Sequence, residues 1–140
     1  MKALFVDDDL ETEVLVKVLR ARHPSDSFDL ADTLPDARKS IWSEKYDVIV
    51  FDIMMPADDM AAPGSSEDAG LISGLLLLDL MRSDPKCPNQ KTRPVVLTGL
   101  VPAEHTKVAS AQKSFGESFM QKPMHPDTVY EILNKPSAQQ

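Results

Sequence analysis

The sequence predicts an α/β fold in which helices cover both faces of a five-stranded parallel sheet. Short apolar runs, which suit strands buried on both faces of such a sheet, alternate five times with helical segments. The connections are short, and parallel crossovers are right-handed, so the chain is expected to wind into a three-layer sandwich. The strand order that follows is 2-1-3-4-5, the flavodoxin-like arrangement with five helices.

Size and charge limit the classes of protein that the chain can belong to. Its 140 residues suffice for one domain with a real core. We assign residues 1–135 to this domain and expect 136–140 to form a disordered tail. A net charge of −7 argues against direct binding to nucleic acid or to an anionic membrane. A single cysteine, no visible signal peptide and no long apolar run predict a cytoplasmic protein.

Each element is predicted from a local pattern. Strands are expected at the short apolar runs 3–6, 28–31, 46–51, 94–97 and 118–121. Helices are expected at 10–22, 35–43, 73–82, 102–113 and 126–134, from helical spacing and prolines in first turns. Asp32 or Thr33 is expected to cap the second helix.

The apolar and charged residues of two of these helices support the assignment. In the first helix, helical spacing is kept by Leu10, Val14, Leu15, Val18 and Leu19. In the fourth helix, Val108 and Ala109 are expected to face inward. Acidic residues near the start of the first helix and basic residues in its second half favour the helix dipole.

The segment between the third strand and the third helix is unusual. Residues 57–70 are small, acidic and rich in turn formers, which predicts a long inserted loop. Lengthening a surface loop costs little entropy, so a tolerated insertion is one interpretation. A lid or a partner-specific docking segment is the other.

Polar side chains follow four of the predicted strands. They are Asp7 and Asp8, then Asp52, Thr98 and Lys122. The carboxyl ends of parallel strands share one edge, where ligands bind in such sheets. Carboxylates brought together repel each other, and oxygen ligands favour Mg²⁺ as the ion that relieves this repulsion. A carboxylate can also act as a nucleophile and form an acyl phosphate, which makes Asp52 a candidate phosphoacceptor.

The remaining residues suit phosphoryl transfer. Mg²⁺, the Lys122 ammonium and the Thr98 hydroxyl or nearby backbone amides would neutralise the three phosphoryl oxygens. Taken singly, an aspartate after a strand is usually a helix cap, which is the role expected for Asp9.

At these positions the chain resembles the receiver domains of two-component response regulators. The resemblance lies in Phe-Val-Asp-Asp-Asp at 5–9, Phe-Asp-Ile-Met-Met-Pro at 51–56, Val-Leu-Thr-Gly at 96–99 and Phe-Met-Gln-Lys-Pro at 119–123. These motifs occur in order and span nearly the whole chain. Gly74 matches the glycine that the family has soon after the phosphoacceptor, with 57–70 inserted before it.

The resemblance implies a phosphoacceptor and a metal site. Asp52 would accept a phosphoryl group from a histidine kinase or a phosphotransfer protein. Asp8, Asp52 and the backbone carbonyl of Met54 would bind Mg²⁺, and Asp7 would hold the ion through water. No other cofactor is implied.

The resemblance also implies a switch. Thr98 would move toward the phosphoryl group, Lys122 would contact it, and Phe119 would turn inward as Thr98 moves. A plain core aromatic is the other interpretation of Phe119. The peptide between Lys122 and Pro123 resembles the family's cis bond, although trans is the default for such a peptide.

The expected function is a phosphorylation-dependent signalling switch. We expect the protein to catalyse only its own phosphorylation and dephosphorylation, and no other reaction. Its output is expected to be a contact with a downstream protein through the fourth helix, fifth strand and fifth helix. A phosphorylation-dependent dimer, onward transfer of the phosphoryl group in a relay, and a receiver cut from a longer protein remain open.

Two rivals have different chemistry. One is a degenerate receiver that acts as a phosphate-independent docking module. The other is an Mg²⁺-dependent phosphohydrolase with Asp52 as nucleophile. Such an enzyme needs a second acid close by as proton donor, whereas residues 53–56 are Ile, Met, Met and Pro.

Overall fold

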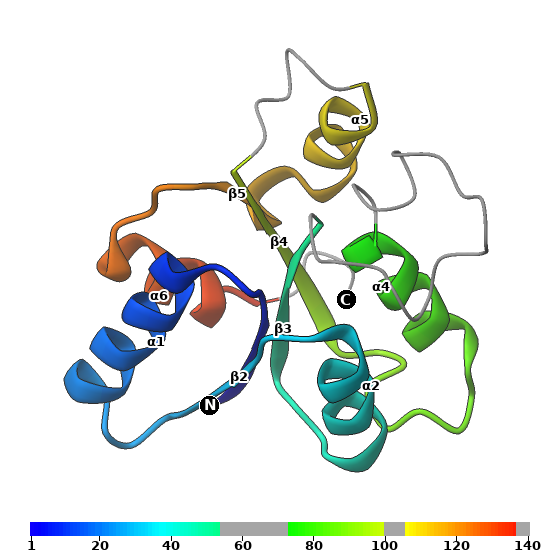
Figure 1. Ribbon diagram of the computed structural model, residues 1–140, viewed down its shortest axis with the longest axis horizontal. Helices are drawn as coiled ribbons and strands as arrows, with labels where there is room; N and C mark the ends of the chain where they lie inside the picture. Colours follow the sequence, from blue (N-terminus) through cyan, green and yellow to red (C-terminus); the bar gives the residue numbers. More distant parts are fainter. Residues whose placement is uncertain (54–72, 100–105, 137–140) are drawn as a thin grey trace.

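Five parallel strands form one sheet in the order β2-β1-β3-β4-β5 (Figure 1), in a computed structural model that describes residues 1–53, 73–99 and 106–136. The strands are β1 (Lys2–Val6), β2 (Ser27–Ala31), β3 (Val48–Asp52), β4 (Arg93–Thr98) and β5 (Phe119–Gln121). The α-helices of the described part are α1 (Leu10–Arg22), α2 (Leu34–Ser43), α4 (Ser73–Ser83), α5 (Thr106–Phe115) and α6 (Pro126–Asn134). The predicted fold class and strand order are therefore confirmed.

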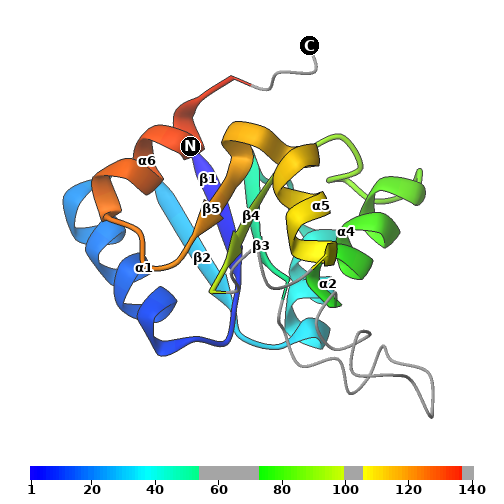
Figure 2. The same ribbon diagram turned by 90° about the horizontal axis from the view of Figure 1, so that it is seen from above.

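Helices cover both faces of the sheet. In Figure 2, α1 and α6 lie on one side, and α2, α4 and α5 lie on the other. Neighbouring residues of the central strands point to opposite sides: Val48 and Val50 pack with α1 and α6, whereas Ile49 and Phe51 pack with α2 and α4. The sheet is thus apolar on both faces, and polar groups are left at the strand ends.

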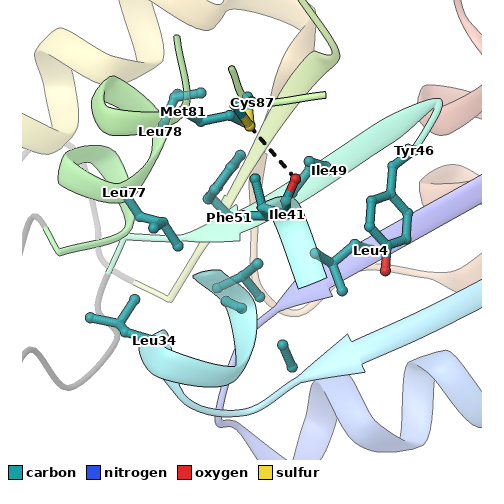
Figure 3. Close-up of a cluster of buried hydrophobic side chains, with 13 residues drawn as sticks. Leu4, Leu34, Ile41, Tyr46, Ile49, Phe51, Leu77, Leu78, Met81 and Cys87 are labelled. Carbon is teal, nitrogen blue, oxygen red and sulfur yellow. Dashed lines mark hydrogen bonds between the residues drawn. The ribbon is translucent and has the colours of Figure 1, made fainter. Parts of the chain in front are cut away.

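The cluster between the sheet, α2 and α4 shows how the sequence fills one layer (Figure 3). Ile41 of α2 and Leu77 of α4 are fully buried there. The thiol of Cys87 lies in the same cluster and donates a hydrogen bond to the Ile41 carbonyl at 3.6 Å. Burial raises the pKa of the Cys87 thiol, which keeps it protonated and unreactive.

The helix ends agree with the sequence in most places. Asp9 caps α1 through the amide of Glu11, and Thr33, not Asp32, caps α2 through the amide of Asp36. The α6 helix has the predicted bounds. A short 3-10 helix, η2 (Gly116–Ser118), takes up the predicted first residue of the fifth strand.

One residue predicted to face inward is exposed, and two apolar residues that keep helical spacing are exposed as well. In α5, Ala109 is exposed, and Ala111 is buried together with Val108. In α1, Leu10 and Val14 are 75% and 60% exposed.

The buried residues of α1 are Thr12, Val16 and Leu19. The cap at Asp9 and the hydrogen bond from Thr12 to Asp7 fix the rotation of α1, so its inward stripe is less apolar than the spacing alone suggests.

Some predictions lie outside the described residues. They are the inserted loop at 57–70, the start of the fourth predicted helix at 102–105, and most of the tail at 136–140. Within the described part of the chain, no helix is long and apolar enough to cross a membrane.

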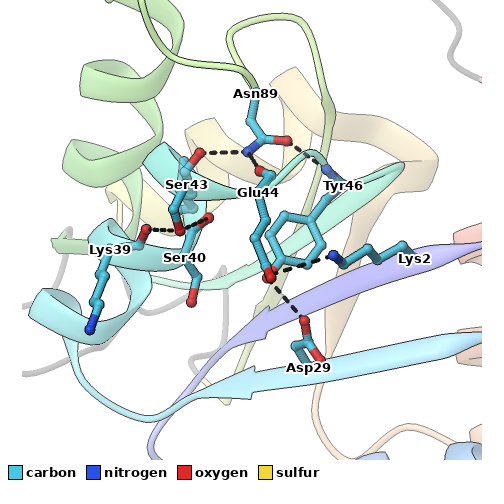
Figure 4. A network of polar contacts seen from close by, with 9 residues as sticks. Lys2, Asp29, Lys39, Ser40, Ser43, Glu44, Tyr46 and Asn89 are labelled. Atoms are coloured by element: carbon cyan, nitrogen blue, oxygen red, sulfur yellow. Dashed lines mark hydrogen bonds and ion pairs between the residues drawn. The ribbon is translucent and has the colours of Figure 1, made fainter.

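A buried asparagine joins the end of α2 to the start of β3 (Figure 4). The amide nitrogen of Asn89 donates to the carbonyls of Ile41 and Glu44 at 2.6 and 2.5 Å. Its oxygen accepts from the Tyr46 amide at 2.8 Å and from the Thr92 hydroxyl at 2.9 Å. Asn89 is fully buried, so its side chain replaces water as a hydrogen-bond partner of these backbone groups.

Replacing Asn89 with alanine should therefore destabilise the fold strongly. We expect Asn89→Ala to lower the free energy of unfolding by about 3 kcal/mol, because several buried polar groups lose their partners at once. Urea denaturation followed by circular dichroism measures the change. Lys91→Ala, at an exposed position of the same loop, should stay within about 0.5 kcal/mol of the unchanged protein. Equal stability of the two variants would contradict this account.

Candidate functional site

The register of the sheet brings the predicted polar residues to one edge. Val6 pairs with Phe51, so Asp7 and Asp52 follow side by side at the ends of β1 and β3. Asp52 pairs with Leu97, which places Thr98 one residue beyond it. The backbone amide of Lys122 donates to the carbonyl of Thr98 at 2.8 Å, which ties the end of β5 to the end of β4.

Three of these residues form an acidic cluster. Ligand oxygens of Asp7, Asp8 and Asp52 all lie within 4.8 Å of one another. Asp7 and Asp52 are buried, at 2% and 4% exposed, whereas Asp8 is exposed. Carboxylate oxygens alone suit a hard divalent cation such as Mg²⁺. The donor set therefore fits the predicted ion, while Met54, the predicted carbonyl ligand, lies outside the described residues.

Lys122 supplies the positive charge at this edge. Its ammonium lies 2.8 Å from Asp7, 3.2 Å from Asp9 and 3.4 Å from Asp52, measured from Nζ to Oδ2 in each case. Burial opposes the charge on Lys122, but the hydrogen bond to Asp7 and the charges of Asp52 and Asp7 outweigh it, so the pKa of Lys122 is raised. The side chain stays charged and lies beside the predicted phosphoacceptor.

Two further residues belong to this site although the sequence did not predict them there. Asp9 was predicted as a helix cap, which it is, and its second oxygen also contacts Lys122. The Glu11 amide and Lys122 lower the pKa of Asp9. The buried Thr12 donates a hydrogen bond to Asp7 at 2.6 Å. The signal that could have indicated Thr12 is a polar residue four positions before Val16, on the inward stripe of the helix.

The predicted switch residues lie on neighbouring strands. Thr98 is fully buried at the end of β4. Phe119 begins β5 and pairs with Val96. Phe119 is partly buried against a small cluster of Ile53, Val96 and Val108.

Solved structures of known proteins share this architecture. No family profile and no curated protein matches the chain. The receiver domain of a Francisella response regulator matches with a TM-score of 0.63 and 24% identity, over 95% of this chain and 93% of that one. The chemotaxis response regulator CheY4 of Vibrio cholerae matches with a TM-score of 0.63 and 20% identity, over 94% of both chains.

A response regulator from Burkholderia pseudomallei, with a phosphorylated aspartic acid, a calcium ion and citrate, matches at 20% identity. Its TM-score is 0.61, over 96% of this chain and 66% of that one. The chain has the receiver-domain fold. The peptide between Lys122 and Pro123 is cis, as the resemblance to receiver domains implied.

In this receiver fold, Gly74 packs directly against the backbone of Asp52. A Cβ atom at Gly74 would lie 2.2 Å from the carbonyl oxygen of Asp52 and 3.0 Å from the Cα of Ile53. No side chain fits at such distances, so the first turn of α4 approaches the end of β3 as closely as only glycine allows. Gly74 thereby helps to fix the backbone that carries Asp52.

The substitution Gly74→Ala should disturb this contact. We expect the free energy of unfolding to fall by about 3 kcal/mol, because backbone atoms on both sides have to shift. Urea denaturation measures the change. Gly99→Ala is the matched control, since its Cβ would meet only the Lys122 Cδ, at an ordinary 4.0 Å. If Gly74→Ala instead stabilised the protein by about 1 kcal/mol, the effect would come from helix propensity alone. That result would contradict the close approach of Gly74 to the Asp52 backbone.

Proposed function

We propose that the chain is a phosphorylation-dependent signalling switch of a two-component system, in which Asp52 accepts a phosphoryl group with the help of Mg²⁺. The observation that carries this proposal is the buried cluster of Asp7 and Asp52 with Asp8, in contact with Lys122, at the carboxyl edge of a receiver fold. The related fold of the Burkholderia protein with a phosphorylated aspartic acid supports the same chemistry here.

The residues of the chain divide the work of phosphoryl transfer. A carboxylate oxygen of Asp52 attacks the phosphorus of a phosphohistidine, the bond from phosphorus to the imidazole nitrogen breaks, and an acyl phosphate forms. Lys122, already 3.4 Å from Asp52, would contact one phosphoryl oxygen, and the Thr98 hydroxyl another. Mg²⁺, when bound, neutralises charge on the phosphoryl oxygens.

The proposed metal ligands are those that the resemblance to receiver domains implies. Asp8 and Asp52, with the Met54 carbonyl, would hold the ion, and Asp7 would hold it through water. The chain would then catalyse only its own phosphorylation and dephosphorylation. No second acid follows Asp52 directly, where Ile53 is fully buried in the apolar cluster, so rapid hydrolysis of other phosphoesters is not part of the proposal.

The signal would leave the site through β4 and β5. Thr98 lies at the end of β4, and Phe119, at the start of β5, pairs with Val96, two residues before Thr98. Movement of Thr98 toward a phosphoryl group would shift Phe119 and with it the face formed by α5, β5 and α6. The proposed output is contact with a downstream protein in the cytoplasm, since the charge of −7 disfavours direct DNA binding.

The central test is phosphorylation from a small donor. Incubation with acetyl phosphate and Mg²⁺ should add the mass of one phosphoryl group, measured by intact-protein mass spectrometry. Asp52→Asn and an EDTA-treated sample should show no gain, because the nucleophile or the ion is missing. Beryllofluoride serves as a stable mimic if the acyl phosphate decays quickly. Absence of both the mass gain and Mg²⁺-dependent beryllofluoride binding would sink the proposal.

A phosphodonor protein needs a place to dock, and α1 offers one. Asp52 is buried, so its donor must lie over the carboxyl edge of the sheet. Leu10 follows Asp9 directly, Val14 lies one helical turn further along α1, and both side chains are exposed. A groove of about 190 Å³ is lined by Val14 and reaches Lys122 and Met124. We therefore assign this apolar face to the protein that carries the phosphohistidine.

Polar substitution on this face should separate the two kinds of donor. Leu10→Ser with Val14→Ser should slow transfer about tenfold or more from a phosphorylated histidine phosphotransfer protein that phosphorylates the unchanged chain. The rate with acetyl phosphate should not change, because the chemical groups are intact. Leu76→Ser on α4, the same change at another exposed leucine, should leave both rates unchanged. Equal slowing with both donors would place the defect in the site and not in docking.

A further inference from the structure

The inward face of α1 carries a hydroxyl at an unexpected place. Its buried residues are Thr12, Val16 and Leu19, and the latter two pack with the sheet in an apolar cluster. Thr12 is only 2% exposed. Valine would fill nearly the same volume without burying a polar atom, which costs free energy unless the atom is hydrogen-bonded. The partner of the Thr12 hydroxyl therefore indicates why a threonine stands there.

That partner is the carboxylate of Asp7. The Thr12 hydroxyl lies 2.6 Å from Asp7 Oδ2, and it must be the donor because an ionised carboxylate only accepts. The other oxygen, Oδ1, accepts from the backbone amide of Asp9 at 3.0 Å. The first turn of α1 thus holds both oxygens of Asp7. Hydrogen bonds of this short, charge-assisted kind fix orientation well.

From this geometry we infer that Thr12 is a positioning residue for the Mg²⁺ site, an inference that rests on the proposed function. A carboxylate has about four acceptor positions, and here the two donors of α1 use one on each oxygen. Lys122 also donates to Oδ2, at 2.8 Å, so one acceptor position of Asp7, on Oδ1, is left for the water shell of an ion. Thr12 thereby fixes the orientation in which the Asp7 carboxylate would bind the water shell of the ion. Partners of this kind usually govern metal affinity, although they never touch the metal.

A purely structural role for Thr12 predicts a different result. If the hydroxyl only satisfied the buried Asp7, its loss would change stability and leave Mg²⁺ affinity alone. Measuring both the Mg²⁺ affinity and the free energy of unfolding of the same variants distinguishes a positioning role from a purely structural one. Thr12→Val removes the hydroxyl and keeps the shape, Thr12→Ala removes both, and Thr12→Ser keeps the hydroxyl.

The experiment is titration of the full chain with MgCl₂ by isothermal calorimetry, beside urea denaturation in EDTA. We expect Thr12→Val and Thr12→Ala to weaken Mg²⁺ binding by about 10- to 100-fold. Thr12→Ser should bind close to the unchanged protein. At Mg²⁺ concentrations that saturate each variant, phosphorylation of Asp52 by acetyl phosphate should return toward the unchanged rate, because Asp52 and Lys122 are intact.

Two results would overturn the inference, and they have different meanings. If the unchanged chain and both hydroxyl-free variants bind Mg²⁺ equally, Thr12 has only a structural role and the proposed function stands. If the unchanged chain binds no Mg²⁺, the inference and the proposed function fail together. Because two hydroxyl-free variants are measured, poor folding of one of them leaves the comparison intact.

Discussion

The structure depends on a concentration of negative charge at one edge of the sheet. Asp7 and Asp52 are both buried, with ligand oxygens within 4.8 Å of each other. Two like charges at that separation repel by roughly 3 kcal/mol at an effective dielectric constant near 20. Lys122 offsets this repulsion through contacts with Asp7, Asp9 and Asp52. Such a cluster lowers stability unless something binds there, which is the usual sign of a functional site.

The apolar sheet holds this cluster in place. Because β1, β3 and β4 are buried on both faces, their polar residues can lie only at the strand ends. The parallel register then fixes which ends are neighbours. The sequence could therefore predict one site formed by Asp7, Asp52, Thr98 and Lys122. Local apolar patterns give the strand ends, and the general rule that ligands bind at the carboxyl ends of parallel strands brings those ends together.

The rest of the site could not be predicted in the same way. The rotation of α1 is decided by contacts between residues that the spacing rule does not weigh, namely the Asp9 cap and the bond from Thr12 to Asp7. Leu10 and Val14 keep the helical spacing but are exposed, and the spacing gave no role to Thr12. Gly74 is a similar case. Its place in a family motif can be recognised from the sequence, but the need for glycine is visible only in the structure. A Cβ atom at this position would lie 2.2 Å from the carbonyl oxygen of Asp52.

The first turn of α1 thus serves two sides of the site at once. On its inner side, Asp9 forms an ion pair with Lys122, and Thr12 donates a hydrogen bond to Asp7. From its outer side, Leu10 presents an apolar surface to solvent. Because a packed helix shifts as a rigid body, the residues on its inner side and those on its outer side move together. The proposed docking face and the groups that position Asp7 and Lys122 are therefore coupled. Under the proposed function, a phosphodonor bound against Leu10 would be placed near Asp52 by the same turn of helix that orients Asp7.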